Sequence, residues 1–345
     1  MRAVTYQEPG RIAVEDRPEP ELQDPSDAIV KIDAAGICGS DLHVYHATHR
    51  EVEKGFIIGH EYVGTVLAVG DGVTELAEGD RVLGSFFSSC GRCFQCRRAL
   101  YSQCENLRVF GFGSALGNLP GTQAEQALVP NAHLTLRKVS PRLSEAAALF
   151  AGDVMSTAYH SVLQGDLKPG QSCAVVGLGP IGLCAVMVAK AAGATPVLAF
   201  DSVDDRLEVA RGLGAHPVHF QEEDVAAVVS DHTNGRGVDV AIEAVGHPAA
   251  LDLASRVCRK SATISVVGIH SGTIEIAIGQ IFGKNITVKT GRANVIGNLD
   301  EVLALLEAGV LDPAPLVSRE MSLEDAPEAY AAFDRREALK ILLRP

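Results

Sequence analysis

The feature that most constrains the fold is a glycine-rich turn, GLGPIG, between a strand-like run and a helix-like run at residues 173–189. Gly177, Gly179 and Gly182 form the pattern G-x-G-x-x-G, which is informative only in this strand–turn–helix context. The first glycine permits the tight turn, the second lets backbone approach a pyrophosphate, and the third lets the helix pack on the strand. The run is uncharged enough to imitate a membrane helix, but its glycines and proline favour buried α/β structure. The turn therefore predicts a dinucleotide site.

The residues around this turn indicate which dinucleotide would bind. Pro180 and Ile181 open the helix, whose unpaired N–H groups and positive dipole end suit a pyrophosphate. Asp201 ends the next strand-like run, where a carboxylate can accept hydrogen bonds from both adenosine ribose hydroxyls. That carboxylate would repel a 2′-phosphate, which favours NAD over NADP. Two alternatives remain open: Asp201 as a cap of the following helix, and Arg206 as either a contact of the adenosine end or a solvated helix residue.

Strand and helix patterns divide the chain into two kinds of region. From about residue 150 they alternate, with six strand candidates separated mostly by helical runs, which predicts a doubly wound parallel (Rossmann) sheet. The first third has short strand candidates without helices, which suggests a β-rich domain. We expect an α/β protein in which residues 1–153 and 291–345 form the β-rich domain and residues 154–290 the nucleotide domain.

Length and charge bound the class of protein. A chain of 345 residues suits two domains, and its net charge of -13 argues against nucleic acid and anionic membranes as partners. The N-terminus carries no basic-then-apolar signal pattern, so we expect a cytoplasmic location. In that compartment closely spaced cysteines are more often a metal site than disulfides.

Half of the eight cysteines lie in CGRCFQCRRALYSQC, with the spacing C-x2-C-x2-C-x7-C. Cys90, Cys93, Cys96 and Cys104 suit one tetrahedral Zn²⁺, and four thiolates leave no position for water or substrate. Such a site is structural, and backbone N–H groups should point at its sulfur atoms. A redox pair would need a thioredoxin-like context that the sequence lacks.

Two upstream motifs, AGICGSDLHVYH and IIGHEYVGTV, precede the cysteine loop and the glycine turn. In this order the motifs resemble the zinc-dependent medium-chain alcohol dehydrogenases along nearly the whole chain. The resemblance implies a GroES-like catalytic domain beside the Rossmann domain, and a second, catalytic zinc held by Cys38, His60 and Asp153. Asp153 stands where the animal enzymes of the family carry cysteine. At this ligand position the chain is similar to some bacterial relatives instead. Both acidic residues have an alternative to a role at the metal. Asp153 could be the N-cap of a helix, and Glu61 could be a carboxylate whose hydrogen bonds are satisfied within the fold.

The resemblance also implies a mechanism. An alcohol bound to zinc loses its proton and passes hydride to NAD⁺. Ser40, a ribose hydroxyl of the cofactor and His43 carry the proton away, and Glu61 lies close to the metal; the alternative for His43 is a surface histidine without a role. Other residues match cofactor or pocket positions: Thr157, Val267 and Ile269 toward the nicotinamide, and Phe86 in the substrate pocket. For the apolar residues of this set, core packing is the alternative. Gly39 replaces a basic residue that some relatives use on the pyrophosphate, and Lys340 is a candidate substitute.

The expected activity is reversible, zinc- and NAD-dependent oxidation of small or medium apolar primary and secondary alcohols, with two zinc ions per subunit. A polyol or amino-alcohol dehydrogenase of the same family is the alternative, and a non-catalytic zinc-stabilised binding protein is an alternative of another class. By analogy with bacterial members we expect a homotetramer. The run TIEIAIG, residues 273–279, suggests an edge strand that continues the sheet across a dimer axis.

Overall fold

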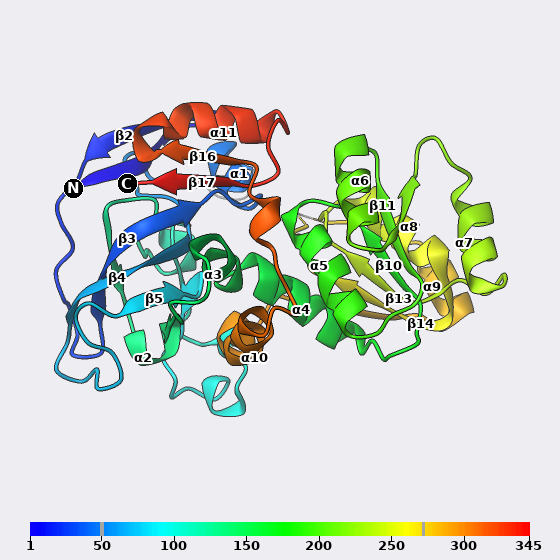
Figure 1. The fold of residues 1–345 in the computed structure, drawn as a ribbon, viewed down its shortest axis with the longest axis horizontal. Coiled ribbons are helices and arrows are strands. Elements are labelled where there is room, and N and C mark those ends of the chain that lie inside the picture. Colours follow the sequence, from blue (N-terminus) through cyan, green and yellow to red (C-terminus); the bar gives the residue numbers. More distant parts are fainter. Residues whose placement is uncertain (49–51, 271–272) are drawn as a thin grey trace. The chain divides into compact units, whose positions relative to one another are not determined.

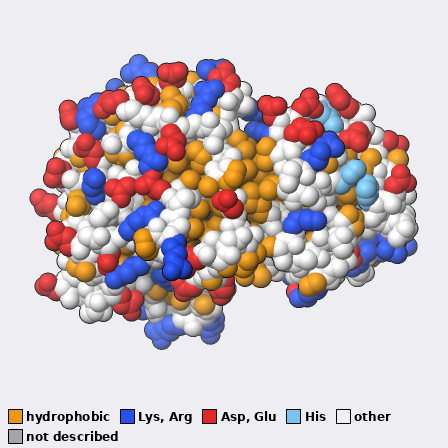
Figure 2. Space-filling model, in the orientation of Figure 1, with side chains coloured by type: hydrophobic (Ala, Val, Ile, Leu, Met, Phe, Trp, Pro, Cys, Tyr) orange, Lys and Arg blue, Asp and Glu red, His pale blue; other side chains and the backbone are white. Residues whose placement is uncertain are grey.

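The computed structural model describes residues 1–48, 52–270 and 273–345. The chain forms two compact units, which we call the first unit (Met1–Ser156 with Asn294–Pro345) and the second unit (Thr157–Ala293), as Figure 1 shows. Among the described residues no helix combines the length and apolar character that crossing a membrane would require. Acidic and basic side chains are interspersed over the face shown in Figure 2.

The second unit contains one six-stranded sheet in which all paired neighbours are parallel. Its strands are β10 (Cys173–Val176), β11 (Val197–Asp201), β12 (His216–His219), β13 (Val238–Glu243), β14 (Cys258–Val266) and β15 (Thr287–Thr290). Their spatial order is β12-β11-β10-β13-β14-β15, so the direction of winding reverses between β10 and β13. All four residues of β10 are buried, as expected for a strand covered on both faces. The predicted doubly wound sheet is confirmed.

Helices cover both faces of this sheet. Two helices that contact each other lie on one face, α5 (Pro180–Ala191) and α6 (Asp204–Gly212). The other face is covered by α7 (Val225–Thr233), α8 (Pro248–Val257) and α9 (Ile278–Lys284), whose apolar residues share one core cluster with Leu198 and Phe200. Helix α5 begins with Pro180, a residue whose fixed φ suits the first helical position. The chain enters this unit through α4 (Val154–Gly165).

The first unit is built mainly of strands. Seven of them form a mixed sheet in the order β16-β17-β3-β4-β5-β9, with β8 beside β3. The strands of the unit are β1 (Arg2–Glu8), β2 (Arg11–Asp16), β3 (Ala28–Gly36), β4 (Glu61–Val69), β5 (Arg81–Gly84), β6 (Phe87–Ser88), β7 (Arg108–Val109), β8 (Gln126–Val129), β9 (Leu136–Lys138), β16 (Arg319–Ser322) and β17 (Ile341–Arg344). Its helices are α1 (Asp41–Tyr45), α2 (Ala132–Thr135), α3 (Glu145–Ala151), α10 (Val295–Glu307) and α11 (Ala326–Asp334). The predicted hairpin is present, because β1 and β2 pair antiparallel.

The last strand brings the C-terminus back to the beginning of the chain. Strand β17 pairs antiparallel with the end of β3, and the Ile37 N–H donates to the Ile341 carbonyl at 3.1 Å. Figure 1 shows β17 beside β3, coloured red and blue. Residues more than 300 positions apart therefore meet where β3 ends, next to Cys38.

One predicted strand is wrong. Residues 273–277 form no regular structure, and α9 begins at Ile278. Ile274 packs against the core, whereas Ile276 and Ile278 are 44% and 69% exposed. Alternation over so few residues does not separate a strand from an irregular segment that buries one side chain. The edge of the sheet is β15 instead.

Candidate active site and metal centres

Among the residues that the structure describes, two groups of side chains have ligand atoms close enough to hold a metal ion. The first consists of Cys38, His60, Glu61 and Asp153, whose ligand atoms lie within 4.8 Å of one another, and all four residues are buried. Cys38 follows β3, His60 and Glu61 stand at the start of β4, and Asp153 lies between α3 and α4. Three separate parts of the first unit thus bring one sulfur, one imidazole and two carboxylates together.

The spacing of three of these ligands fits a tetrahedral ion. Asp153 Oδ2 lies 3.4 Å from Cys38 Sγ and 3.3 Å from His60 Nε2. With zinc bonds of about 2.1 Å to N or O and about 2.3 Å to S, ligand atoms in a tetrahedron are separated by about 3.3–3.6 Å. The donor set of Cys38, His60 and Asp153 therefore suits zinc.

Asp41 supports His60 in this role, and sequence reasoning missed it. Its Oδ1 lies 2.9 Å from His60 Nδ1, and its Oδ2 accepts a hydrogen bond of 2.9 Å from the Cys38 N–H. The Nδ1 contact has a hydrogen-bond distance but not a hydrogen-bond angle, so Asp41 acts on the imidazole mainly by charge. A carboxylate behind the imidazole still favours Nε2 as the metal ligand. The usable signal was the spacing C-G-S-D, which places a carboxylate in the first turn of a helix that begins just after Cys38.

Without a metal the cluster is a concentration of buried charge. Burial and the negative charges of Asp153 and Glu61 raise the pKa of Cys38 to about 11. Burial alone would lower the pKa of His60, but the Asp41 and Asp153 carboxylates raise it well above its ordinary value. Since thiolate and neutral imidazole are the ligand forms, a cation at this position would displace protons from the cluster.

Glu61 connects the cluster to the C-terminal strand. Its Oε2 pairs with the ammonium group of Lys340, which also donates to the Ile37 carbonyl at 3.1 Å. Its Oε1 is buried without a hydrogen-bond partner among the described residues. Lys340 is 0% exposed, so the expectation that it replaces Gly39 as a contact of the pyrophosphate is wrong for this conformation. Glu61, Asp153 and Cys38 instead hold the pKa of Lys340 above its usual value, against the effect of burial.

Polar and aromatic side chains surround the His60 ring. Ser40 Oγ lies 3.1 Å from His60 Nε2, whereas the His43 Nδ1 contact is with Thr48 Oγ1, at 3.1 Å. Phe86 lies edge-on to the ring, with centroids 6.1 Å apart. Phe112, which sequence reasoning missed, is closer, at 5.4 Å. It lies in the run VFGFG, which carries no known motif, so only its place just after the cysteine loop could have indicated it.

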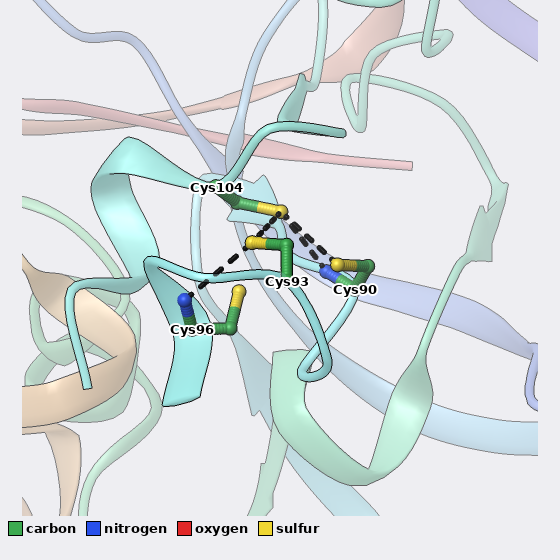
Figure 3. A group of neighbouring side chains, drawn as sticks. All are labelled: Cys90, Cys93, Cys96 and Cys104. Carbon is green, nitrogen blue, oxygen red and sulfur yellow. Dashed lines mark hydrogen bonds between the residues drawn. The ribbon is translucent and has the colours of Figure 1, made fainter. Parts of the chain in front are cut away.

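The second group consists of the four cysteines of one loop, Cys90, Cys93, Cys96 and Cys104. Figure 3 shows their side chains converging, and Cys104 Sγ lies 3.5 Å from Cys90 Sγ and 3.9 Å from Cys93 Sγ. Four thiolates around zinc would be about 3.8 Å apart. This donor set fits a tetrahedral zinc with no ligand position left over.

Backbone N–H groups point at these sulfur atoms. The Cys90 and Asn106 N–H groups donate to Cys104 Sγ at 3.3 Å each, and the Cys96 N–H donates to Cys93 Sγ at 3.5 Å. Burial opposes ionisation of Cys90, but hydrogen bonds from the N–H groups of the loop lower its pKa to about 6. The N–H groups of the loop also lower the pKa of Cys93, whereas burial raises the pKa of Cys96 and of Cys104, so the loop favours the thiolate form at two of its four cysteines.

The glycine turn has the geometry that its sequence predicts at two positions. Gly177 has φ +90°, and a Cβ there would lie 2.3 Å from Val245 Cγ2. A Cβ on Gly182 would lie 1.8 Å from the Gly177 carbonyl oxygen. A Cβ on Gly179, the N-cap of α5, would meet nothing within 4 Å. The third glycine is therefore needed for close packing, and the second faces open space at the helix N-terminus.

Asp201 connects the glycine turn to the residues that follow β11. Its Oδ2 accepts from the Leu178 N–H at 2.7 Å, and its Oδ1 accepts from the Ser202 and Val203 N–H groups at 2.7 and 3.1 Å. Arg206 Nη1 lies 3.8 Å from Oδ2. The carboxylate at the end of β11 thus binds the glycine turn and the two residues that precede α6, whose N-cap is Val203 rather than Asp201. The contact of Asp201 with a ribose stays a prediction.

The remaining predicted cofactor residues lie in the second unit. Pro180 and Ile181 open α5, and Thr157 is buried in the first turn of α4. Val267 and Ile269 follow β14, with Ile269 exposed on the surface of the unit.

Comparisons with known proteins cover the whole chain. Residues 24–139 match the alcohol dehydrogenase GroES-like domain family, and residues 180–308 match the zinc-binding dehydrogenase family. The zinc-type alcohol dehydrogenase B of Aspergillus flavus is 35% identical, over 100% of this chain and 81% of that protein. Sorbitol dehydrogenase of Bacillus subtilis is 33% identical, over 100% of this chain and 97% of that protein.

A solved structure is similar throughout. The alcohol dehydrogenase TADH from Thermus sp. ATN1 is 46% identical, with a TM-score of 0.96 over 100% of this chain and 99% of that chain. Both units of the chain therefore have their counterparts in one known architecture. The chain belongs to the zinc-dependent medium-chain alcohol dehydrogenase family.

Proposed function

We propose that this protein is a zinc- and NAD-dependent alcohol dehydrogenase that interconverts small or medium apolar primary and secondary alcohols with their aldehydes and ketones. The observation that carries the proposal is the mixed cluster of Cys38, His60 and Asp153, with the Ser40 hydroxyl beside it. The ligand set of the four-cysteine loop consists of thiolates alone, and it fills all four positions of a tetrahedral zinc. We therefore assign the chemistry to the mixed cluster and a structural zinc to the loop, so that each subunit holds two zinc ions.

Each residue of the mixed cluster has a proposed task. Bound zinc would lower the pKa of the alcohol hydroxyl, and bound NAD⁺ would accept the hydride. Ser40 Oγ, 3.1 Å from His60 Nε2, would accept the proton from the substrate oxygen. A ribose hydroxyl of the bound cofactor would pass it to His43, which lies partly exposed on α1 and would release it to water, since histidine is the usual proton shuttle.

The side chains around His60 favour apolar substrates. The ring centroids of Phe86 and Phe112 lie 6.1 and 5.4 Å from that of the imidazole. Two aromatic rings beside a zinc ligand support an apolar wall for the carbon chain of the alcohol. A polyol dehydrogenase is the second candidate, because a sorbitol dehydrogenase is among the similar proteins. It would need further polar groups to bind the additional hydroxyls.

NAD is proposed over NADP because the Asp201 carboxylate, which ends β11, is 7% exposed and would meet a 2′-phosphate with like charge. The two units would serve as catalytic and cofactor-binding domains.

A homotetramer is proposed: the number four follows the bacterial members of the family, and the surface of the second unit supports self-association. Ile278 and Phe282 of α9 are 69% and 85% exposed, and all four residues of the edge strand β15 are exposed. Exposed apolar side chains next to an unpaired strand edge favour pairing with a second copy. A monomeric mass by light scattering at micromolar concentration would contradict this.

The decisive test of the activity is a screen of NAD- and NADP-linked oxidation over linear, branched, cyclic and polyhydroxylated alcohols, with zinc measured on the same sample. The proposal expects NAD-linked turnover of apolar alcohols at close to two zinc ions per subunit. Turnover confined to polyols would favour the second candidate, and no turnover at full zinc content would reject both.

A further inference from the structure

Two loops follow the neighbouring strands β13 and β14, at the end of the second unit where the glycine turn lies. The Ala244 N–H donates to the Val176 carbonyl at 3.0 Å, so the loop after β13 begins directly beside the turn after β10. The winding of the sheet reverses between β10 and β13. Ligands of open α/β sheets bind at such a reversal, outside the carboxyl ends of the strands.

Glu243 joins the two loops with a single buried carboxylate. It is 0% exposed, and its Oε1 accepts from the N–H groups of Val245 and Gly246 at 2.8 Å each. Its Oε2 lies 3.1 Å from His270 Nε2, which belongs to the loop after β14. Since a carboxylate only accepts, His270 Nε2–H is the donor of this hydrogen bond.

The loops are in backbone contact where Glu243 joins them. A Cβ on Gly268 would lie 2.1 Å from the Gly246 nitrogen, and a Cβ on Gly246 would lie 2.3 Å from the Ile269 carbonyl oxygen. Gly246 also has φ +80°, which favours glycine. Val245 and Ile269 remain 51% and 48% exposed beside this contact. The contact of His270 with Glu243 therefore lies beside the backbone of Val267–Ile269 and two exposed apolar side chains, and links their loop to the loop after β13.

Stability alone does not account for His270. Its side chain is 13% exposed, and its Nδ1 is buried without a hydrogen-bond partner among the described residues. A buried polar atom left unpaired costs free energy, so an apolar residue would suit a purely structural position better.

We propose that His270 is a positioning residue for the nicotinamide half of the cofactor, acting through Glu243 to hold the loop after β14 against the loop after β13. The inference rests on the proposed binding of NAD and names a residue of this chain that determines its affinity. Gly177, Gly179 and Asp201 would bind the adenosine and pyrophosphate part independently of His270.

The test compares two ligands on the zinc-loaded protein: NADH, and ADP-ribose, which lacks the nicotinamide. Dissociation constants are measured by calorimetry for the wild type and for His270→Asn, His270→Gln and His247→Asn. Glutamine can place an N–H donor about where Nε2 lies, whereas asparagine is too short to reach Glu243. His247 is an exposed histidine in the loop after β13, and asparagine there keeps a capping side chain for α8.

We expect His270→Asn to weaken NADH binding about tenfold, the scale of one charge-assisted hydrogen bond, and to leave ADP-ribose binding within about twofold of the wild type. His270→Gln should retain most of the NADH affinity, and His247→Asn should change neither ligand. Equal effects of asparagine and glutamine at position 270, or equal losses for both ligands, would overturn the proposal. If the wild type bound neither ligand, the proposed function itself would fail.

Discussion

The side chains of Lys340 and Glu61 form an ion pair that is entirely buried, although the two residues lie 279 positions apart in the chain. The pair lies where β17 meets the end of β3, and a Cβ on Gly36 would collide with the Glu61 carboxylate. The C-terminal strand thus supplies the counter-charge of a carboxylate that belongs to the metal-binding cluster.

We predict that Lys340→Met destabilises the first unit by about 3–5 kcal/mol, because it leaves a buried carboxylate without its cation. The double variant Lys340→Met/Glu61→Gln should recover most of this loss, since it removes both charges. Urea unfolding of the zinc-loaded proteins measures both values. A single variant as stable as the wild type would show that the pair contributes little.

The strands and helices of the second unit were predictable because each carries its own local signal. β10 is an apolar run, Gly177 and Pro180 mark the turn and the helix start, and the alternation repeats along the chain. The strand proposed at residues 273–279 failed for the opposite reason, because its alternation covered too few residues to outweigh the tertiary context.

Residues of the candidate site could be predicted from the sequence only where they belong to a recognisable motif. Cys38, His60 and the cysteine loop stand in recognisable patterns, whereas Asp153 was placed by the resemblance alone. Asp41, Phe112 and the burial of Lys340 depend on contacts between segments distant in sequence, and no local pattern encodes such contacts.

We predict that Cys93→Ser lowers zinc content by one ion per subunit and lowers the midpoint of thermal unfolding by roughly 5–10 °C, because four-thiolate zinc contributes directly to folding. The rate of hydride transfer per folded subunit should stay within about twofold of the wild type, measured by single-turnover NADH formation at a temperature where the variant is folded. A large loss of rate in a stable variant would place chemistry in the loop.

Asp239 makes a pH-dependent contribution to the stability of the second unit. It accepts from the Ser172 N–H and Oγ at 2.8 and 2.6 Å, and Arg259 Nε lies 2.7 Å away. Burial raises the pKa of Asp239, but the Ser172 hydrogen bonds and Arg259 outweigh it and hold the pKa below 3.8. A lowered carboxyl pKa stabilises the folded state above the unfolded pKa, and the stabilisation is lost as pH falls through the folded value.

We therefore predict that Asp239→Asn costs about 1–3 kcal/mol near neutral pH and that the cost shrinks below about pH 4. Urea unfolding from pH 7 to pH 3 measures it, with Asp252→Asn as a control, because Asp252 pairs with Arg256 on an exposed helix surface. A cost that grew as the pH fell would contradict the assignment.

For the cofactor, Asp201→Asn should reduce the preference for NAD over NADP by about tenfold in kcat/KM, since the amide removes the like charge opposite a 2′-phosphate. The amide oxygen can still accept one of the backbone hydrogen bonds, so the turn should survive. An unchanged cofactor preference would mean that Asp201 serves the backbone of the turn and α6 alone.

The most direct test of the central claim, that the mixed cluster performs the chemistry, is zinc content and alcohol-dependent NADH formation in Asp153→Ala. We predict one zinc ion per subunit, intact folding by circular dichroism, and a rate at least about a thousandfold lower, with Asp153→Cys retaining both zinc ions and measurable activity. Two zinc ions and an unchanged rate in Asp153→Ala would contradict the account.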